Sequence, residues 1–491
     1  MRKFLVILAC FVFSFTLFGC KKADNLSNIS KDLSTYYLDI SLDCANKKVT
    51  AKQTVTYINN TESILKNIKF HLYPQFFEQG ATNKIVSNTH MNNVYPNGIS
   101  YADFNVDRVQ VENTEKTIVY ENEFDSILNV QLNSSLLPEE STTIKIDFSF
   151  TLPNACHRFG YGDNTINLAN FYPIACVYEN DSFNTNGYNA NGDPFYSDMA
   201  NYCVNIELNQ QYVIAASGNK TNQKIENNFK YVSYEANVVR DFAIVVSDKF
   251  SVVNKETDNT NIEYYYFNDN HPESSLKAGV DAIKTFSKMF GEYPYKNFSI
   301  VETDFIYGGM EYPNLVMIST DITNETDYLN VIVHETAHQW WYGVVGNDEF
   351  TYPWLDESLT EFSTILFYDN NENYQLNHKD MINSSKENYT LFITVYEDVL
   401  GPIDTSMRAV DKYATEPEYT YCTYVKGVLM YDSLYQLIGK NAFNKSLKTY
   451  FENNKYSNAS PEDLITAFEK TTKQNLSNFF ESWISGKVII R

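Results

Sequence analysis

The sequence predicts an α+β protein: an N-terminal antiparallel β-domain over residues 35–250, then a mostly α-helical domain with a small mixed sheet over residues 251–491. Apolar and polar residues alternate with a period of two through the first span, which is typical of half-buried strands. After residue 250 the apolar residues recur at helical spacing instead. A chain of 491 residues, 43% of them hydrophobic, is long enough for two or three domains with sizeable cores.

Residues 1–19 precede this fold and are interpreted as a signal peptide. Arg2 and Lys3 form a positive start, and residues 4–18 are almost wholly apolar. Phe18 does not suit an ordinary Ala-x-Ala cleavage site, whereas Leu-x-Gly-Cys ending at Cys20 resembles a bacterial lipoprotein signal. The resemblance implies that Cys20 is lipidated and that the protein is exported and anchored to the outer face of a bacterial cell membrane. The alternative is an uncleaved membrane anchor.

The polar residues that follow Cys20, up to residue 34, indicate a tether that holds the body of the protein off the membrane. Alternating strands are then expected over residues 49–57, 144–150 and 204–208. Loops rich in Asn, Gly and Asp separate them, the longest over residues 180–193.

In the second half, apolar residues at helical spacing and the breakers that follow them indicate five helices and one short strand. The helices are expected over residues 275–290, 327–342, 355–368, 419–438 and 461–468, and the strand over residues 298–302. No internal repeat interrupts this organisation.

Charge and cysteine content restrict the function. The chain carries 38 basic and 61 acidic residues, a net charge of −23, and has no basic stripe, so we expect no nucleic-acid partner. Five cysteines remain besides Cys10 in the signal and the lipidation site Cys20, and one or two disulfides among them stay open: Cys44, Cys156, Cys176, Cys203 and Cys422. Because there is no CxxC pair, cysteine is a poor candidate for a metal ligand.

One motif points directly to chemistry: His334-Glu335-Thr336-Ala337-His338. Residues four apart on a helix share a face, so the two imidazoles can bind one Zn²⁺. Glu335 is rotated off that face and can reach a water beside the metal, which suits a general base. The alternative is a pair of buried histidines that only form hydrogen bonds.

A catalytic zinc needs a third protein ligand. The segment 354–362 offers three acids, Asp356, Glu357 and Glu361. Glu357 follows His338 by nineteen positions, on a predicted second helix that can pack antiparallel to the first. Glu361 lies one turn further on the same face and is either a partner that orients a histidine or a solvated helix acid.

The spacing of His334, His338 and Glu357 resembles that of the gluzincins and, within them, the M1 aminopeptidase family. Residues 308–313 (GGMEYP) resemble the family's Gly-x-Met-Glu-Asn motif, and residues 424–427 (YVKG) resemble its Tyr-x-Lys-Gly motif. Residues 338–341 (HQWW) resemble the usual continuation of its zinc helix. Residues 37–42 resemble its opening strand, residues 290–295 the run before its catalytic sheet, and residues 479–484 the end of its catalytic domain.

This resemblance implies a thermolysin-like catalytic domain with one Zn²⁺ per chain and peptide substrates that have a free N-terminus. Glu335 is then the catalytic base and Tyr424 the donor to the oxyanion of the tetrahedral intermediate. Glu311 binds the substrate's α-ammonium. Three neighbours of Glu311 complete the expected substrate-binding segment: Gly308, Gly309 and Met310.

The sequence departs from the family in three places. Tyr312 stands where the family usually has Asn, and residues 157–173 take the place of its Gln-based amine-binding motif and its Phe-Pro-Cys-x-Asp-x-Pro segment. The large helical C-terminal domain of many relatives is not expected. Two alternatives therefore stay open: a zinc endopeptidase with an open cleft, and a non-enzymatic surface-binding lipoprotein with a structural zinc. The oligomeric state is not predicted.

Overall fold

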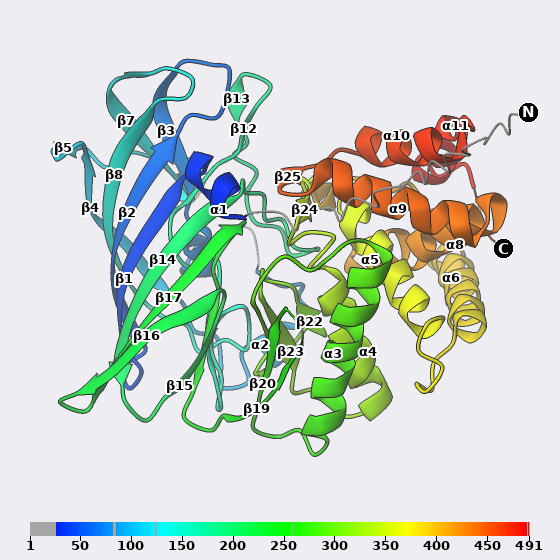
Figure 1. The fold of residues 1–491 in the computed structure, drawn as a ribbon, viewed down its shortest axis with the longest axis horizontal. Helices are drawn as coiled ribbons and strands as arrows, with labels where there is room; N and C mark the ends of the chain where they lie inside the picture. Colours follow the sequence, from blue (N-terminus) through cyan, green and yellow to red (C-terminus); the bar gives the residue numbers. More distant parts are fainter. Residues whose placement is uncertain (1–25, 82–84, 123–124, 258, 489, 491) are drawn as a thin grey trace, which may run out of the picture.

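The computed structural model describes residues 26–81, 85–122, 125–257, 259–488 and 490. The predicted signal over residues 1–19 and the predicted lipidation site Cys20 lie outside these residues. Within the described ranges, none of the helices combines the length and the apolar character needed to cross a membrane. The chain forms two lobes that lie side by side, one built of strands and one mainly of helices (Figure 1).

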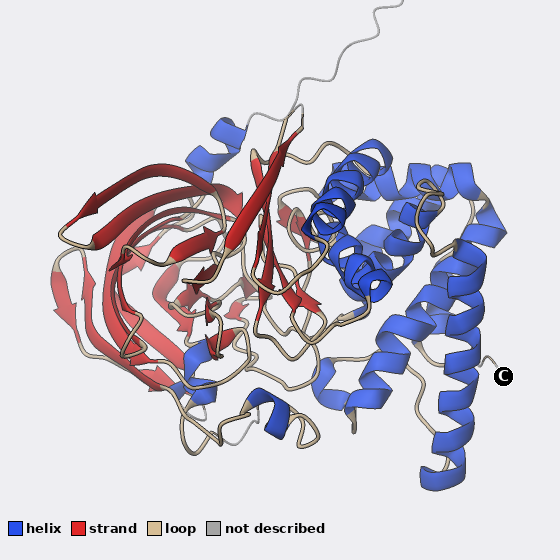
Figure 2. Ribbon diagram, turned by 90° about the horizontal axis from the view of Figure 1, so that it is seen from below, coloured by secondary structure: helices blue, strands red, loops and turns tan. Residues whose placement is uncertain are grey.

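An eight-stranded sheet dominates the first lobe and is strongly curved (Figure 2). Its order is β16-β17-β14-β1-β2-β8-β4-β5. In the same order, the strands span Asn219–Glu226, Phe229–Val239, Ala200–Asn209, Thr35–Asp43, Lys48–Ile58, Ser141–Thr151, Asp103–Val111 and Thr114–Lys116. β1 pairs in parallel with β14, and the other neighbours in this sheet are antiparallel. Alternate residues of β1 are buried, as the period-two pattern predicts.

Smaller sheets pack inside this curve. One has the order β15-β18-β10-β9 and another β11-β3-β7-β6, and β12 pairs with β13. Their bounds, in the same order, are Val213–Ala216, Ile244–Ser247, Ile166–Leu168, Phe159–Tyr161, Ile174–Ala175, Leu65–His71, Ile127–Leu136, Tyr120–Glu121, Tyr178–Glu179 and Ser182–Phe183. The short helices α1 (Leu26–Ile29) and α2 (Met91–Val94) complete the lobe.

The second lobe contains a mixed sheet of order β19-β20-β21-β23-β22. The strands span Ser251–Glu256, Asn261–Tyr266, Asn297–Thr303, Leu315–Ser319 and Gly309–Met310. β21 is parallel to β20 and β23, whereas β19 and β22 are antiparallel to their neighbours. Every residue of β21 is buried, as expected of a central strand.

Helices cover one side of this sheet and extend away from it (Figure 1). They are α3 (Pro272–Met289), α4 (Glu325–Ala337), α5 (Trp354–Tyr368), α6 (His378–Leu400), α7 (Glu416–Thr420), α8 (Lys426–Ile438), α9 (Lys440–Asn454), α10 (Pro461–Thr472) and α11 (Ser477–Ile484). The short strands β24 (Val345–Gly346) and β25 (Ser457–Asn458) pair in parallel. The predicted α+β class, with a β-domain followed by a helical domain with a small mixed sheet, is confirmed.

Two predicted helices differ in detail. The helix expected to reach residue 342 ends at Ala337, because Tyr342 adopts a φ of 128° and Trp341 bridges to Val345. The helix expected over residues 419–438 contains a π-helical turn over Tyr421–Val425 between α7 and α8. The five cysteines that follow Cys20 are all free thiols, so none of the disulfides that the sequence left open is formed.

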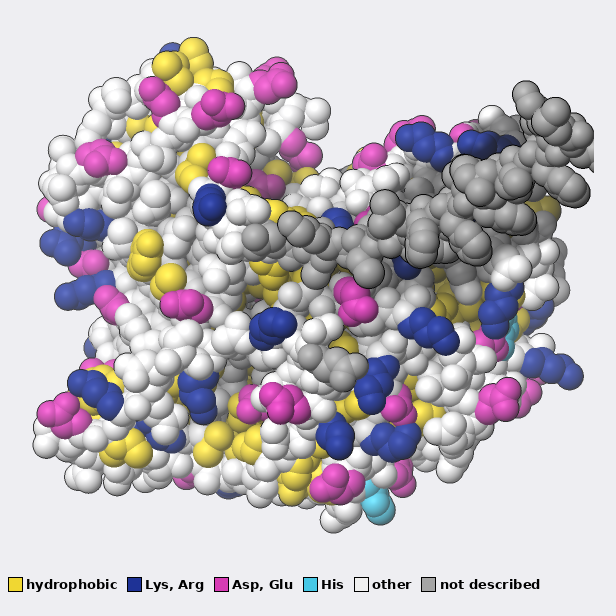
Figure 3. Space-filling model, in the orientation of Figure 1, with side chains coloured by type: hydrophobic (Ala, Val, Ile, Leu, Met, Phe, Trp, Pro, Cys, Tyr) yellow, Lys and Arg dark blue, Asp and Glu magenta, His cyan; other side chains and the backbone are white. Residues whose placement is uncertain are grey.

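Arg240 joins the two lobes. Its guanidinium is buried and donates to the carbonyl of Ser197 in the β-lobe at 2.9 Å, and to those of Tyr342 and Ser457 in the helical lobe, both at 2.6 Å. Together with a bond to the side-chain oxygen of Asn458, these main-chain contacts tie the two lobes to each other. On the face drawn in Figure 3, basic side chains lie among acidic ones over both lobes.

Candidate active site

Three side chains on two neighbouring helices form a compact donor set. His334 Nε2 lies 3.1 Å from His338 Nε2, and Glu357 Oε2 lies 3.2 Å from His338 Nε2 and 3.5 Å from His334 Nε2. Ligands placed tetrahedrally about 2.0–2.1 Å from a zinc-sized ion are roughly 3.3–3.4 Å apart. The triangle therefore fits three ligands of one tetrahedral ion.

The other ring nitrogens of the two histidines are also engaged. His338 Nδ1 lies 3.0 Å from the carbonyl oxygen of Trp341 and 3.2 Å from the hydroxyl of Thr360. An Nδ1–H that donates to the carbonyl leaves the Nε2 lone pair free for a metal. His334 Nδ1 is 3.6 Å from Glu361 Oε1, so Glu361 lies near the histidine that it would orient in one of the two alternatives left open for it.

Glu335 lies beside the donor set and has little space. Its side chain is buried and Oε2 has no hydrogen-bond partner. Burial raises the pKa of Glu335 to about 7, against the lowering effect of the two imidazoles. A Cβ added to Gly309 would lie 2.3 Å from Glu335 Oε1, so only glycine allows edge strand β22 to run this close.

Glu357 has the opposite balance of effects. Burial acts to raise its pKa, but His338 and His334 outweigh this and hold the pKa of Glu357 below its usual range. Glu357 is therefore a carboxylate, the form that can ligate a metal. Tyr424 donates its hydroxyl to Glu357 Oε1 at 2.5 Å, which brings the predicted oxyanion donor next to the donor set.

A cavity of about 400 Å³ opens onto these groups, and both lobes line it. Gly308, Gly309 and Glu311 belong to its wall. Glu311 Oε1 is buried without a hydrogen-bond partner, and burial raises the pKa of Glu311 well above its usual value. Met310 belongs to the same predicted segment, but its side chain does not line the cavity: successive strand residues face opposite sides, and Met310 is buried against Arg158.

Comparison with known proteins identifies the helical half. Residues 274–483 match the Peptidase family M1 domain. Residues 274–483 are thus similar to this family's domain and are called the M1 domain below. Aminopeptidase N of Escherichia coli (strain K12) is 29% identical over 224 residues, which cover 43% of this chain and 25% of that protein. Aminopeptidase M1 of Arabidopsis thaliana is 24% identical over 310 residues, 59% of this chain and 34% of that protein. The chain thus spans about a third or less of the length of these curated relatives.

The M1 zinc metallopeptidase of Deinococcus radiodurans has the same two-lobed fold. It superposes with a TM-score of 0.67 at 16% identity, over 93% of this chain and 95% of that one. At this identity the similarity shows the fold alone, and it covers the β-lobe as well as the M1 domain.

Several residues that line the cavity were not predicted from the sequence, among them Asn191, Asp193, Glu416 and Tyr419. Asp193 belongs to the β-lobe, at the end of the Asn-rich loop noted in the sequence. That loop showed no pattern of ligand spacing, so composition alone could mark it only as a loop. Arg158, from the segment that departs from the family pattern, lies behind Asp193 and forms an ion pair with it.

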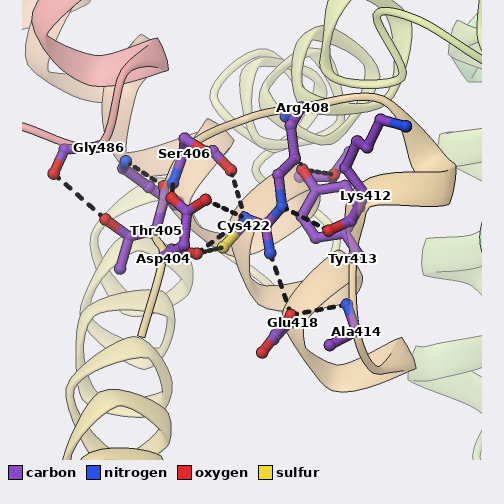
Figure 4. A network of polar contacts seen from close by, with 12 residues as sticks. Asp404, Thr405, Ser406, Arg408, Lys412, Tyr413, Ala414, Glu418, Cys422 and Gly486 are labelled. Carbon is purple, nitrogen blue, oxygen red and sulfur yellow. Dashed lines mark hydrogen bonds and ion pairs between the residues drawn. The ribbon is translucent and has the colours of Figure 1, made fainter. Parts of the chain in front are cut away.

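A polar network supports the part of the M1 domain that carries Tyr424 (Figure 4). Arg408 donates to the carbonyls of Asp404 and Lys412 at 2.8 and 3.0 Å and to Glu418 Oε2 at 3.0 Å. Its guanidinium lies 4.2 Å from the centre of the Tyr413 ring. The segment over residues 404–418 is thus folded around one cation just before the π-helical turn, which fixes the start of that turn.

Proposed function

We propose that this protein is a zinc-dependent peptidase that removes N-terminal residues from peptides. The observation that carries the proposal is the donor triangle of His334, His338 and Glu357, which shares one cavity with Glu335, Tyr424 and the unpartnered carboxylate of Glu311. A zinc ion held by these three ligands would supply Lewis-acid chemistry, polarising the scissile carbonyl and acidifying a water. The family membership of the helical half and the names of its relatives support the same reading.

Glu335 acts as the general base in this proposal. It takes a proton from the attacking water and gives it to the leaving amine. Tyr424 donates its hydroxyl to the oxygen of the scissile carbonyl as negative charge develops there, in exchange for its present bond to Glu357. The edge of β22 offers backbone groups with which an extended peptide can pair.

Glu311 favours an aminopeptidase over the alternative of a zinc endopeptidase. A buried carboxylate without a partner is costly, and a substrate ammonium would neutralise it. An internal peptide bond brings no such cation. The other alternative, a binding lipoprotein with a structural zinc, leaves Glu335 and Tyr424 without a role.

A panel of aminoacyl-coumarin substrates tests this function. We expect the pure full-length protein to cleave them, to lose activity with a chelator and to recover it with zinc. N-acetylated versions of the same substrates should be cleaved at least a hundredfold more slowly. Equal cleavage of both forms would establish the endopeptidase, and no peptide turnover with zinc bound would contradict the proposal.

We also propose that Cys20 anchors the exported protein to the outer face of a bacterial membrane. The lipoprotein-like signal in the sequence supports this. Metabolic labelling with a radioactive fatty acid should mark the wild-type protein and leave the variant Cys20→Ala unlabelled. Labelling of both proteins to the same extent would contradict the anchor.

A further inference from the structure

A second cavity, with a volume of about 580 Å³, lies between the two lobes. Of the described residues that line it, none also lines the catalytic cavity. The β-lobe supplies most of its wall, from the start of β1 and β14, the end of β2 and the hairpin of β12 and β13, and residues 456–458 beside β25 close it from the helical lobe. Figure 1 shows this hairpin at the boundary, and in Figure 3 the surface is hollowed between the lobes with acidic side chains on the β-lobe side.

Negative charge dominates the wall of this cavity. Among the described residues that line it, four are acidic and Arg240 alone is basic. The guanidinium of Arg240 is already bound to the carbonyls that join the lobes. In the part of the chain that the structure describes, no lysine or arginine forms an ion pair with any of the four acids. They are Glu62, Glu179, Asp181 and Asp198.

A tyrosine hydroxyl in the same wall has no partner. The Tyr57 side chain lines the cavity and is 8% exposed, and within the described ranges its hydroxyl makes no hydrogen bond. Burial raises the pKa of Tyr57, and the negative charge of Asp198 raises it further. A polar group this buried is unfavourable until water or a ligand bonds to it. The hydroxyl of Tyr57 therefore marks a place for a polar ligand next to Asp198.

Other groups in the wall are held in place by the protein. The Tyr196 hydroxyl donates to Glu179 Oε2 at 3.3 Å, and Asn458 Nδ2 of the helical lobe donates to Asp198 Oδ1 at 3.1 Å. A carboxylate has about four lone-pair sites, so both acids can accept further hydrogen bonds from a ligand. The two carboxylates are thus positioned before a ligand arrives, which reduces the entropy lost on binding.

The spacing of these acids suits an organic cation better than a metal ion. Groups of three ligand atoms within 4.8 Å of one another occur, among the described residues, only around the catalytic cavity, and none of these groups includes an acid of the second cavity. A metal ion needs ligands that converge on one point. Ammonium groups spaced along a flexible chain can instead reach separate carboxylates, and tyrosine rings attract such cations. The volume lies in the range of small-molecule sites, about 300–1,000 Å³.

We propose that this second cavity binds a small organic oligoamine, a flexible molecule with two or more ammonium groups. Asp198 and Glu179 bind the ammonium groups, and the hydroxyl of Tyr57 accepts a further hydrogen bond. Because both lobes form the wall, the bound amine also stabilises the folded two-lobe arrangement. The site shares no residue with the catalytic cavity and does not depend on the proposed peptidase function. The rival reading is a water-filled gap whose charge attracts any cation.

Calorimetric titration of the zinc-loaded full-length protein with spermidine tests the site. The double variant Asp198→Asn with Glu179→Gln removes two charges and keeps the side-chain shapes. Its control, Asp163→Asn with Glu115→Gln, removes the same two charges at exposed positions of the β-lobe. The titrations are done at about 0.15 M salt, where attraction beyond about 8 Å is largely screened.

We expect wild type to bind spermidine at one saturable site and the double variant to bind it about tenfold more weakly or worse, since charge-assisted hydrogen bonds are lost. The control should bind it as wild type does. The thermal midpoint should rise with spermidine in wild type and in the control, and rise less in the double variant. Equal weakening in the double variant and its control would show that only net charge matters and would overturn the proposal, as would the absence of saturable binding in wild type.

Two further variants locate the bound amine. Tyr57→Phe removes one hydroxyl, so we expect about threefold weaker binding with an unchanged circular-dichroism spectrum. It also decides the matter if the double variant does not fold, because wild-type affinity in folded Tyr57→Phe would contradict the site. Glu311→Gln changes the catalytic cavity instead and should bind spermidine as wild type does. Weaker binding in Glu311→Gln together with wild-type affinity in the double variant would place the amine in the catalytic cavity and overturn the proposal.

Calcium chloride at matched ionic strength separates an oligoamine site from a metal site. We expect calcium to leave the affinity for spermidine within twofold of its value in sodium chloride. Displacement of spermidine by an equal concentration of calcium would show that the carboxylates prefer a metal ion and would overturn the proposal. None of these measurements needs peptide turnover, so the site and the proposed peptidase function can fail separately.

Discussion

The position of the Glu335 carboxylate depends on the absence of a side chain at Gly309. The glycine lets the edge strand approach Glu335 Oε1 to a distance that a methyl group would block. The carboxylate is consequently held between the strand and the donor set, where burial raises its pKa to about 7. A group that both accepts and returns a proton near neutral pH suits the role proposed for it.

The variant Glu335→Gln tests this role without changing the shape of the site. Because the amide cannot accept the proton of the attacking water, we expect kcat to fall by about 10²–10⁴-fold or more. Zinc content, measured by elemental analysis, and the circular-dichroism spectrum should match wild type. Unchanged turnover would mean that another group is the base.

Tyr424 is tested by Tyr424→Phe. The ring stays and only the hydroxyl that bonds to Glu357 is lost. Removing one donor to a developing oxyanion costs about 10²–10³-fold in kcat. We expect kcat to fall by this factor while KM changes less than threefold. Steady-state kinetics on the best substrate measure both. A defect in KM alone would instead indicate that Tyr424 contributes to substrate binding and not to the transition state.

The parts of the site that could be predicted from sequence are those fixed by local spacing. His334 and His338 share a helix face, and Glu357 follows on the next helix. The carbonyl of Trp341 that fixes His338 is a main-chain group with no sequence signature. Asp193 comes from the other lobe and reaches Glu311 only through the tertiary fold, so spacing along the chain could not reveal it.

At the scale of elements, His378 links three helices. At the start of α6, its Nδ1 lies 3.0 Å from Asp369 at the end of α5, and its Nε2 lies 3.0 Å from Asp432 on α8. Hydrogen bonds to the two carboxylates raise the pKa of His378 to about 9. The unfolded value is near 6.5, so the stabilisation is complete below about pH 6.5 and is lost as pH rises through about 9.

We therefore expect the stability of wild type to fall between pH 6.5 and 9.5, and His378→Gln to lose most of that slope. Urea midpoints at pH 6.5, 8 and 9.5 measure it. The exposed neighbour Lys379→Gln is the control and should keep the wild-type slope over the same three pH values. Parallel curves for wild type and His378→Gln would show that the two carboxylates do not charge His378.

The helix α6 itself was not predicted, and its exposed residues explain why. Tyr389, Phe392 and Ile393 are buried, but Leu391 and Val395 are 62% and 50% exposed. Apolar residues on both faces obscure the one-sided periodicity on which helix prediction relies. The end of α4 was missed for a different reason: Trp340 and Trp341 continue an apolar helical pattern, but main-chain bonds from Gly343 to His338 and from Val345 to Trp340 turn the chain there.

At the scale of the whole molecule, the contact between the lobes that a single substitution can test is the set of hydrogen bonds made by Arg240. Replacing it with methionine removes the donor to two buried carbonyls, those of Tyr342 and Ser197, at roughly 1–3 kcal/mol each, and to the part-buried carbonyl of Ser457. We expect Arg240→Met to lower the free energy of unfolding by about 3 kcal/mol or more and to separate the unfolding of the two lobes in calorimetry.

The control for this variant is Arg108→Met. Arg108 is 44% exposed and pairs with Asp147 on the sheet surface. An exposed ion pair contributes about 0–1 kcal/mol, so this variant should unfold like wild type. A single unfolding transition at the wild-type midpoint in Arg240→Met would show that the lobes are held together by their apolar contacts instead.

The partners of Arg240 have a consequence for variation among related sequences. Apart from one bond to the side-chain oxygen of Asn458, the Arg240 guanidinium binds main-chain carbonyls, which reflect the path of the chain and not the identity of its side chains. Positions 197, 342 and 457 can therefore drift in sequence while the joint persists, whereas position 240 cannot. Among related sequences, substitutions at this boundary should therefore occur at the positions that supply the carbonyls and not at position 240. Chimaeras that exchange either lobe should remain joined as long as the arginine is kept.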